Sequence, residues 1–505
     1  MMKKKPTLVI GIDAGTQTLR AGVFTTDGEL IKSVTRNYGF TQPYYGWAEQ
    51  NSLEVLEALI DAIKECTLSA EVTSRGKIGA ISIVGTTVSL VACDSSNELL
   101  MPVILWMDTR STSEADYLES IGSEWLKYTG NKLSPEWMLA KALWISRNKP
   151  EIFRQIKHFS ELSDWLDFKL TGNWTASLTT LSAEWTYCSD LGGWPTDLLT
   201  QCGLDDLISK VPLMILPPGG IVGPLQPSIA KDLGLPTDVV VTKGLMDSYA
   251  SALSLGVLDR KRITVSIGTS SAYIATSDIP KFDKGLVGTV PDAFGRGVWA
   301  LQGGQTSAGA IIQWFIDQLG EQTNYQELDI LAQGIPPGSN GLVALDCWQG
   351  SRSPYRDPLA RGALLGLNLK HTKAHVYKAL LESVAYGGRQ ILEIIKSTGI
   401  SPDGLWICGG GTRSNLLMQI HADVLGLPLY ISPFPDMAMV GAAVCALVGT
   451  GLRSNLLVSS MSISRVGRTV TPNIKAHEKY TPYYEEYCQS YPLLNMTMHR
   501  LANLA

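Results

Sequence analysis

Residues 7–24 read TLVIGIDAGTQTLRAGVF, and this stretch decides the fold. Two apolar, β-branched runs flank a short turn, which is the pattern of a β-hairpin. Gly15 lets the backbone approach a ligand, and the neighbouring hydroxyl and N–H groups can bind a phosphate. Asp13 has the wrong charge for a phosphate unless a divalent cation lies between them, so we assign it to a metal. An ordinary N-terminal hairpin is the competing interpretation. The residues expected to face the phosphates are Gly15, Thr16, Gln17, Thr18 and Arg20.

A second copy of this pattern favours the phosphate interpretation. Residues 263–275, ITVSIGTSSAYIA, again place Gly-Thr-Ser-Ser between two β-runs. Two such hairpins indicate an internal duplication, with two related domains facing each other across a nucleotide cleft. This arrangement resembles the superfamily of actin, sugar kinases and heat-shock chaperones. The sequence has no P-loop, because Gly76-Lys77 lacks an upstream glycine at the required spacing. The second hairpin contributes Gly268, Thr269 and Ser270 to the expected phosphate site.

Length and composition limit the class of protein. The chain of 505 residues is long enough for two or three domains, and its 45% hydrophobic and 18% charged residues are typical of a globular α/β enzyme. A net charge of −5 provides no field that would recruit nucleic acid or an acidic membrane. Eight cysteines without a CxxC pair favour reduced thiols and a cytoplasmic location. The start MMKKK resembles a signal peptide, but Asp13 interrupts its apolar run, and the apolar residues 437–451 are too few to span a bilayer.

Two later segments carry candidate ligand contacts. Residues 104–110, ILWMDTR, end a strand with Asp108 and Arg110 two positions apart, a pair that can bracket sugar hydroxyls as acceptor and donor. A local surface ion pair is the alternative. Residues 405–415 run from a strand through a glycine turn into a helix, the usual place for a nucleotide against bare backbone. We expect Trp106 and Trp47 to form flat apolar walls against the sugar. We expect the adenosine to be held by Gly409, Gly410, Gly411 and Asn415.

Over essentially its full length the chain resembles the FGGY family of carbohydrate kinases. Residues 362–382 are similar to the second signature of that family. The first signature is met only in part. Its matching positions are Lys141, Trp144 and Asn148, whereas Met138 and Ala142 depart from it.

Within this family the chain looks most like the ribulokinase branch, over residues 134–137, 161–166 and 304–309. The resemblance implies an α/β fold of two ribonuclease-H-like domains around a nucleotide cleft. It also implies a sugar-binding domain at residues 1–252 and an ATP-binding domain at residues 253–505. ATP and Mg²⁺ are the expected cofactors, a small sugar is the expected substrate, and a homodimer is left open.

In this family the catalytic base is an aspartate that follows a short strand and a glycine, which here is Asp247 in the segment KGLMDS. A sugar hydroxyl is a poor nucleophile, so a carboxylate within hydrogen-bond reach can take its proton as the phosphoryl group arrives. The small residues that follow predict a helix, and a simple N-cap is therefore the structural alternative. A helix N-terminus also keeps a carboxylate ionised, so the two interpretations are compatible.

The resemblance leaves the sugar less defined. The arginine–glutamate pair of glycerol kinases would fall near Thr87, and neither it nor the methionine–histidine pair of xylulokinases is present. Ribulokinases use a lysine near Glu184 or Thr186 and an acidic residue near Gln302, and both are also missing. We expect a ketopentose of the ribulose type, phosphorylated on a terminal hydroxyl. Xylulose, another ketose, erythritol and glycerol are alternatives, and a chaperone-like or regulatory ATPase is a different class. The resemblance assigns Thr87 and Gln302 to the sugar and Gln305 to the nucleotide.

Overall fold

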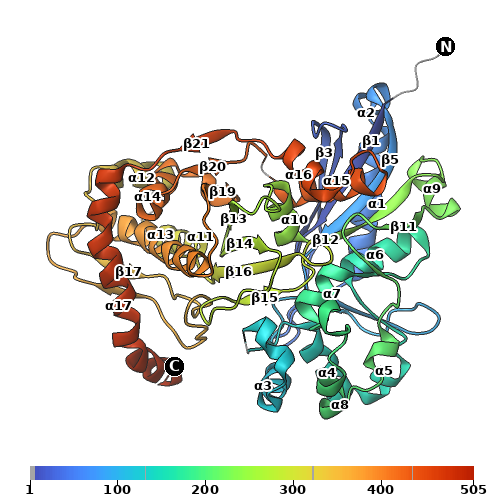
Figure 1. The fold of residues 1–505 in the computed structure, drawn as a ribbon, viewed down its shortest axis with the longest axis horizontal. Coiled ribbons are helices and arrows are strands. Elements are labelled where there is room, and N and C mark those ends of the chain that lie inside the picture. Colours follow the sequence, from blue (N-terminus) through green and yellow to red (C-terminus); the bar gives the residue numbers. More distant parts are fainter. Residues whose placement is uncertain (1–5, 131, 321–323, 435, 505) are drawn as a thin grey trace.

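The computed structural model describes residues 6–130, 132–320, 324–434 and 436–504. The lysine-rich start at residues 1–5 lies outside this range. The described chain forms two α/β halves, each built on a mixed sheet (Figure 1). None of its helices combines the length and apolarity that crossing a membrane requires.

The first half contains a six-stranded sheet in the order β11-β12-β5-β1-β2-β3. The predicted hairpin forms its centre, because β1 pairs antiparallel with β2 and parallel with β5. Nearly every residue of β1 is buried, as expected for a strand covered on both faces. The strands are β1 (Thr7–Ala14), β2 (Thr18–Phe24), β3 (Leu30–Asn37), β5 (Lys77–Gly85), β11 (Ile221–Pro224) and β12 (Val240–Met246).

Successive side chains of β1 point to opposite faces of this sheet. Leu8, Ile10 and Ile12 belong to the core formed with helices α1 (Ser52–Leu68) and α6 (Leu162–Thr171). Val9 belongs to the core on the other face, which contains α10 (Asp247–Ser254) and α15 (Met437–Gly449). The small helices α2 (Ala70–Arg75) and α9 (Pro227–Leu233) complete this part.

An insertion extends the first half below its main sheet (Figure 1). A four-stranded sheet in the order β4-β7-β6-β8 is covered by short helices, and this layer has its own apolar core. The strands are β4 (Glu49–Gln50), β6 (Leu90–Cys93), β7 (Val103–Ile104), β8 (His158–Glu161) and the separate pair β9 (Ala176–Ser177) and β10 (Ile215–Leu216). The helices are α3 (Thr112–Ile121), α4 (Met138–Asn148), α5 (Pro150–Gln155), α7 (Leu178–Glu184) and α8 (Thr196–Cys202), with 3₁₀ turns η1 (Glu124–Thr129), η2 (Ser189–Leu191) and η3 (Leu207–Lys210).

The second half repeats the central arrangement of the first, an antiparallel hairpin with a parallel neighbouring strand. Its seven-stranded sheet has the order β15-β16-β14-β13-β19-β20-β21, and the second predicted hairpin, β13–β14, again has a parallel neighbour, β19. The strands are β13 (Arg262–Ile267), β14 (Ser271–Ser277), β15 (Gly288–Val290), β16 (Trp299–Gln305), β19 (Gly404–Cys408), β20 (Leu429–Ile431) and β21 (Arg468–Val470), with β17 (Val343–Leu345) and β18 (Ala363–Leu365) apart. The helices are α11 (Gly309–Leu319), α12 (Tyr325–Gln333), α13 (Lys373–Ser397), η4 (Gly410–Arg413), α14 (Asn415–Leu425), α16 (Leu456–Ile463) and α17 (Ile474–Leu504).

Helix α15 crosses from the second half to the first. In Figure 1 it lies beside β1 and β5, although its residues come from the C-terminal part of the chain. Small residues make this contact close. A Cβ on Gly11 would lie 2.2 Å from the carbonyl oxygen of Met439, and one on Gly441 would lie 2.1 Å from that of Ala250. Most of the apolar stretch 437–451 thus forms an internal helix, which packs α10 tightly against the first sheet.

Candidate active site

A cleft of about 1000 Å³ lies between the two halves and receives residues from both. The first half contributes the end of β1, the loop after β5 and the start of α10. The second half contributes its hairpin, β16 and the glycine turn after β19. Of the residues expected from the sequence, the cleft is lined by Asp13, Thr87, Trp106, Asp247, Gly268, Ser270, Gln302 and Gly409.

Asp247 is the first residue of α10. Its Oδ1 accepts a hydrogen bond from the backbone N–H of the next residue, Ser248, at 2.6 Å. The N-cap position of this helix is Met246 and no side chain caps it, so the N-cap interpretation of Asp247 is wrong. Burial raises the pKa of Asp247 to about 6, although the Ser248 hydrogen bond acts in the opposite direction. A carboxylate with a pKa slightly below neutral is ionised at pH 7 and still basic enough to accept a proton.

Asp13 lies at the end of β1 and is 8% exposed. Arg20 bridges two carboxylates, with its Nη1 3.6 Å from Asp13 Oδ2 and its Nε 3.3 Å from Asp436 Oδ1. Burial and the nearby charge of Asp247 raise the pKa of Asp13 to about 7, with Arg20 opposing them. Asp13 Oδ1 is buried and has no hydrogen-bond partner in the part of the chain that the structure describes.

This arrangement fits a magnesium ion. Mg²⁺ prefers oxygen ligands and is usually held by one or two carboxylates, with water and phosphate oxygens completing its shell. The unpaired oxygen of Asp13 supplies such a ligand. Among the described residues no group of three or more histidines, cysteines or acids could hold a metal alone. The donors therefore suit an ion that shares its ligands with a phosphate.

The two hairpin tips have similar local bonding. Gly15 N–H donates to the carbonyl oxygen of Thr18 at 2.9 Å, and Gly268 N–H donates to that of Ser270 at 2.9 Å. The hydroxyl of Thr16 already accepts a hydrogen bond from Trp106 Nε1 at 2.9 Å. This bond joins the first hairpin to the loop expected to wall the sugar, while Gln17 is exposed.

The three glycines after β19 have different surroundings. Gly409 has φ +97°, and a Cβ there would lie 2.4 Å from the carbonyl oxygen of Ile267. A Cβ on Gly411 would lie 2.6 Å from Ile267 Cγ2. At Gly410 the nearest atom would be the flexible end of Arg413 at 3.2 Å. Gly410 is therefore the one of the three with room for a side chain, since its neighbours need to be glycine for packing against β13, while Gly409 is the one that lines the cleft.

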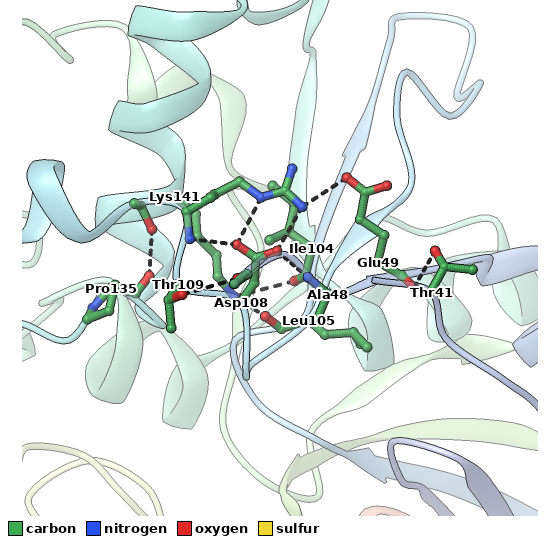
Figure 2. A network of polar contacts seen from close by, with 12 residues as sticks. Thr41, Ala48, Glu49, Ile104, Leu105, Asp108, Thr109, Pro135 and Lys141 are labelled. Atoms are coloured by element: carbon green, nitrogen blue, oxygen red, sulfur yellow. Dashed lines mark hydrogen bonds and ion pairs between the residues drawn. The ribbon is translucent and has the colours of Figure 1, made fainter. Parts of the chain in front are cut away.

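The structure does not support direct sugar contact by Asp108 and Arg110. Figure 2 shows Asp108 near the centre of a polar network, with Glu49 and Ala48 beside it. Arg110 donates to both oxygens of Asp108 at 2.8 and 2.7 Å and to Glu49 at 2.9 Å, and its side chain is 1% exposed. The guanidinium also lies 3.6 Å above the ring of Trp47. Because Asp108 and Arg110 are buried and already paired, the pair holds the loop that carries Trp106, and Trp47 serves as its packing surface.

Lys141 supports the same loop from α4. Its buried Nζ donates to the carbonyl oxygens of Val88, Leu105 and Ile104, the last two at 2.8 and 3.4 Å. Burial lowers the pKa of Lys141 to about 8, against the attraction of nearby carboxylates. The lysine noted in the first family signature thus ties the segment after Thr87 to the segment before Trp106.

The side chains of two residues predicted to contact the nucleotide instead form hydrogen bonds within the protein. Gln305 is 2% exposed, and its Nε2 donates to Asp346 Oδ2 at 2.7 Å and to the carbonyl oxygen of Val384 at 3.0 Å. Asn415 accepts a hydrogen bond from Arg468 at the surface. Neither residue lines the cleft, so the structure does not support direct nucleotide contact by their side chains.

Several charged cleft residues were not found from the sequence as ligand contacts. They come from segments far apart in the chain, and no local pattern marks them as neighbours. Two of them are acids on the wall of the first half, and the others are bases from both halves. These residues are Glu136, Glu184, Lys132, Arg352 and Arg356.

Comparison with known proteins agrees with this geometry. Residues 8–254 match the N-terminal domain of the FGGY family of carbohydrate kinases, and residues 263–450 match its C-terminal domain. The FGGY carbohydrate kinase domain-containing protein of Danio rerio is 28% identical, over 95% of this chain and 97% of that protein. The ribulokinase of Geobacillus thermodenitrificans is 29% identical, over 96% and 94%.

A solved structure shows the same fold. The xylulose kinase from Rhodospirillum rubrum has a TM-score of 0.87 and 27% sequence identity, covering 97% of this chain and all of that one (100%). Relatives named for ribulose and for xylulose thus occur at similar identity. The two-domain α/β fold and the enzyme class expected from the sequence are confirmed. The chain belongs to the FGGY family of carbohydrate kinases.

Proposed function

We propose that this kinase transfers the γ-phosphoryl group of ATP to a terminal hydroxyl of a ketopentose of the ribulose type. The observation that carries the proposal is the position of Asp247. This partly buried carboxylate begins a helix and lines the same cleft as Asp13 and the second hairpin. A base and a phosphate-binding turn on one cleft are what phosphoryl transfer to a hydroxyl requires.

In the proposed step, Asp247 accepts the proton of the sugar hydroxyl as its oxygen forms a bond to the γ-phosphorus. The bond from that phosphorus to the β–γ bridging oxygen breaks, and ADP leaves with this oxygen. The N–H of Ser248 keeps Asp247 oriented, since it holds one carboxylate oxygen at 2.6 Å. Asp13 would hold Mg²⁺, which neutralises phosphate charge when bound.

Three cleft residues from the sequence analysis support a sugar longer than glycerol. Trp106 is 37% exposed and offers an apolar face, while Thr87 and Gln302 offer small polar groups. A polyol that is too short would leave such polar groups unpaired, at about 1–3 kcal/mol each. The relatives' names support ribulose and xylulose equally, so xylulose is the main competitor.

An ATP-coupled assay with D- and L-ribulose, D- and L-xylulose, erythritol and glycerol tests the proposal. We expect ADP release that depends on a ketopentose, with glycerol at least about tenfold poorer in kcat/KM, a difference of about 1.4 kcal/mol. A preference for glycerol would refute the ketopentose assignment and leave the kinase assignment standing. ADP release without any sugar dependence would instead favour the regulatory ATPase.

A further inference from the structure

A loop of the second half forms part of the cleft wall and is held from behind by α17. This loop joins β17 to β18, and its residues 349–352, 356 and 358 line the cleft. We call residues 349–358 the rim loop. In Figure 1 α17 runs along the outer side of the second half, and no described residue of this helix lines the cleft. Contacts between α17 and the rim loop therefore connect an outer helix with the cleft wall.

Arg356 of the rim loop spans the cleft to the first half. Its Nη1 donates to the carbonyl oxygens of Thr129 and Gly130 at 2.8 and 2.6 Å. In the other direction, Lys132 Nζ donates to the carbonyl oxygen of Arg356 at 2.9 Å. Both the side chain and the backbone of Arg356 thus join the rim loop to the first half.

The backbone of Arg356 has a conformation that residues with a Cβ rarely adopt. Its φ is +52°, in the left-handed region, and such a conformation persists only where the surroundings hold it. The next residue, Asp357, provides this support. Its backbone exchanges two hydrogen bonds with Ser351, at 2.8 and 2.9 Å, and its Oδ1 accepts one from the N–H of Leu359 at 2.9 Å. The direction of the Arg356 side chain therefore depends on the position of Asp357.

Two side chains of α17 bind the other carboxylate oxygen of Asp357. Tyr491 donates its hydroxyl to Oδ2, and His499 Nε2 lies 2.6 Å from the same oxygen. Because an ionised carboxylate only accepts hydrogen bonds, we assign the proton of His499 to Nε2. Burial would raise the pKa of Asp357, but the hydrogen bonds from Tyr491 and His499 oppose it and hold this pKa below its ordinary value. Helix α17 thus holds Asp357 as an oriented carboxylate.

Ring packing and a second carboxylate extend the contact. Tyr491 stacks on Tyr355 of the rim loop with ring centroids 3.9 Å apart, and the Tyr355 hydroxyl donates to the carbonyl oxygen of Cys488 at 3.4 Å. Just before the rim loop, Asp346 Oδ1 accepts a hydrogen bond from the hydroxyl of Tyr487 at 2.5 Å. The helix therefore holds the rim loop near both of its ends.

We propose that Tyr491 and His499 are positioning residues, which act through Asp357 to keep Arg356 bonded across the cleft. Through these contacts α17 sets the balance between the open and closed forms of the cleft. Loss of the contacts favours the open form, from which bound sugar and ATP leave more readily. The kinetic test of this inference rests on the proposed kinase function, whereas the position of the rim loop can be tested without turnover.

The variant Tyr491→Phe/His499→Leu removes both hydrogen bonds to Asp357 Oδ2 and keeps the ring that stacks on Tyr355. In the coupled assay we expect KM for sugar and for ATP to rise about tenfold, because apparent affinity falls with the fraction of the closed form. Saturating ligands restore the closed form, so kcat should stay within about threefold. A merely structural role would instead reduce the amount of active enzyme, which lowers kcat and leaves KM unchanged. If the double variant is unfolded at the assay temperature, Tyr491→Phe alone is the test, with an expected rise of about threefold.

Two further variants serve as controls. Tyr484 also lies on α17, and its hydroxyl donates to Glu393 of α13 at 2.6 Å. Tyr484→Phe therefore removes the same kind of hydrogen bond from the same helix without altering a contact to the rim loop, and both KM values should stay within about twofold. His499→Gln keeps a side-chain donor for Asp357 and should keep both KM values within about threefold.

A double-mutant cycle tests whether α17 acts through Arg356. Arg356→Met removes the hydrogen bonds to Thr129 and Gly130 and should itself raise both KM values about tenfold. Adding Tyr491→Phe/His499→Leu to this variant should change KM by less than about twofold, because residues that act through one shared contact are not additive. Independent effects would multiply to about 100-fold.

Hydrogen–deuterium exchange of the ligand-free protein follows the rim loop directly. The N–H groups of Ser351, Asp357 and Leu359 should exchange at least about fivefold faster in Tyr491→Phe/His499→Leu, and at the parent rate in Tyr484→Phe. Unchanged exchange, unchanged KM values, or effects that multiply in the cycle would each overturn the inference. If the parent shows no sugar-dependent turnover, the kinase proposal fails, while faster exchange of the rim loop still supports its attachment to α17.

Discussion

Asp247→Asn is the substitution that tests the proposed base most directly. Asparagine keeps the size of the side chain and an oxygen that can accept the Ser248 N–H bond of 2.6 Å, so the start of α10 should be preserved. It cannot accept the substrate proton. We expect kcat to fall by about 10²- to 10⁴-fold, the usual contribution of a general base. In free energy this loss is about 3–5 kcal/mol of barrier height.

The pH dependence of kcat/KM in the parent enzyme gives a second quantitative test of Asp247. With a pKa of about 6, Asp247 in the unliganded enzyme is roughly nine-tenths ionised at pH 7 and one-tenth ionised at pH 5. Because only the ionised form accepts a proton, kcat/KM should fall about tenfold between pH 7 and pH 5. The residual activity of Asp247→Asn should lack the part of this decline that Asp247 causes.

The assay is coupled ADP release at saturating ATP, with the sugar varied, for parent and variant at several pH values. KM values for sugar and ATP should stay within about threefold of the parent, since an interaction made only in the transition state affects kcat. A variant with kcat within threefold of the parent would show that Asp247 is not the catalytic base. A large loss accompanied by a lowered melting temperature would be assigned to folding instead.

Three other substitutions separate the remaining roles. Gly410→Ala should raise KM for ATP at least about threefold, because the added Cβ would hinder the close approach of the adenosine. KM for sugar and the melting temperature should stay unchanged, since within the protein the Cβ meets only a flexible side chain at 3.2 Å. Asp13→Asn should raise the Mg²⁺ concentration for half-maximal activity about tenfold, and a chelator should abolish activity in the parent; an unchanged Mg²⁺ dependence would remove Asp13 from the metal site. Arg110→Met should lower the free energy of unfolding in urea by about 3–5 kcal/mol, because it leaves Asp108 buried without its cation. Unchanged stability with a tenfold higher KM for sugar would restore the direct-contact interpretation of Arg110.

The parts of the fold that the sequence predicted depend on local patterns. Both hairpins are recognisable because a glycine and hydroxyl-rich turn lies between two short β-runs, and topology then fixes where their tips lie. The same holds for Asp247, since a residue between a buried strand and a helix must lie at the carboxyl edge of the sheet. Function at such an edge follows from the order of elements without knowledge of distant contacts.

The site assignments that the structure does not support share a different cause. Asp108 and Arg110 are polar neighbours in sequence, but their burial depends on Glu49 and Ala48, about sixty residues away. The side-chain amide of Gln305 donates its hydrogen bonds to Asp346 and to a backbone carbonyl of α13. The spacing of residues in the sequence does not show whether a polar side chain forms its hydrogen bonds with the protein or with a ligand. Glu136 and Glu184 were not predicted as cleft residues for the same reason, since they come together only after folding.

The contacts between the two halves indicate where the cleft opens. Near Asp247 the halves are joined by apolar packing and by glycine contacts such as Gly441 on Ala250. Elsewhere along the cleft Arg356, from the second half, donates to the carbonyl oxygens of Thr129 and Gly130 at 2.8 and 2.6 Å, and Tyr128 stacks on Trp299 with ring centroids 5.6 Å apart. Such hydrogen bonds contribute about 1 kcal/mol each and exchange readily with water, whereas separating α10 from α15 would expose a close-packed core. We therefore expect the Arg356 side to open for substrate entry, while Asp247 keeps its place near Asp13 of the first hairpin throughout the motion.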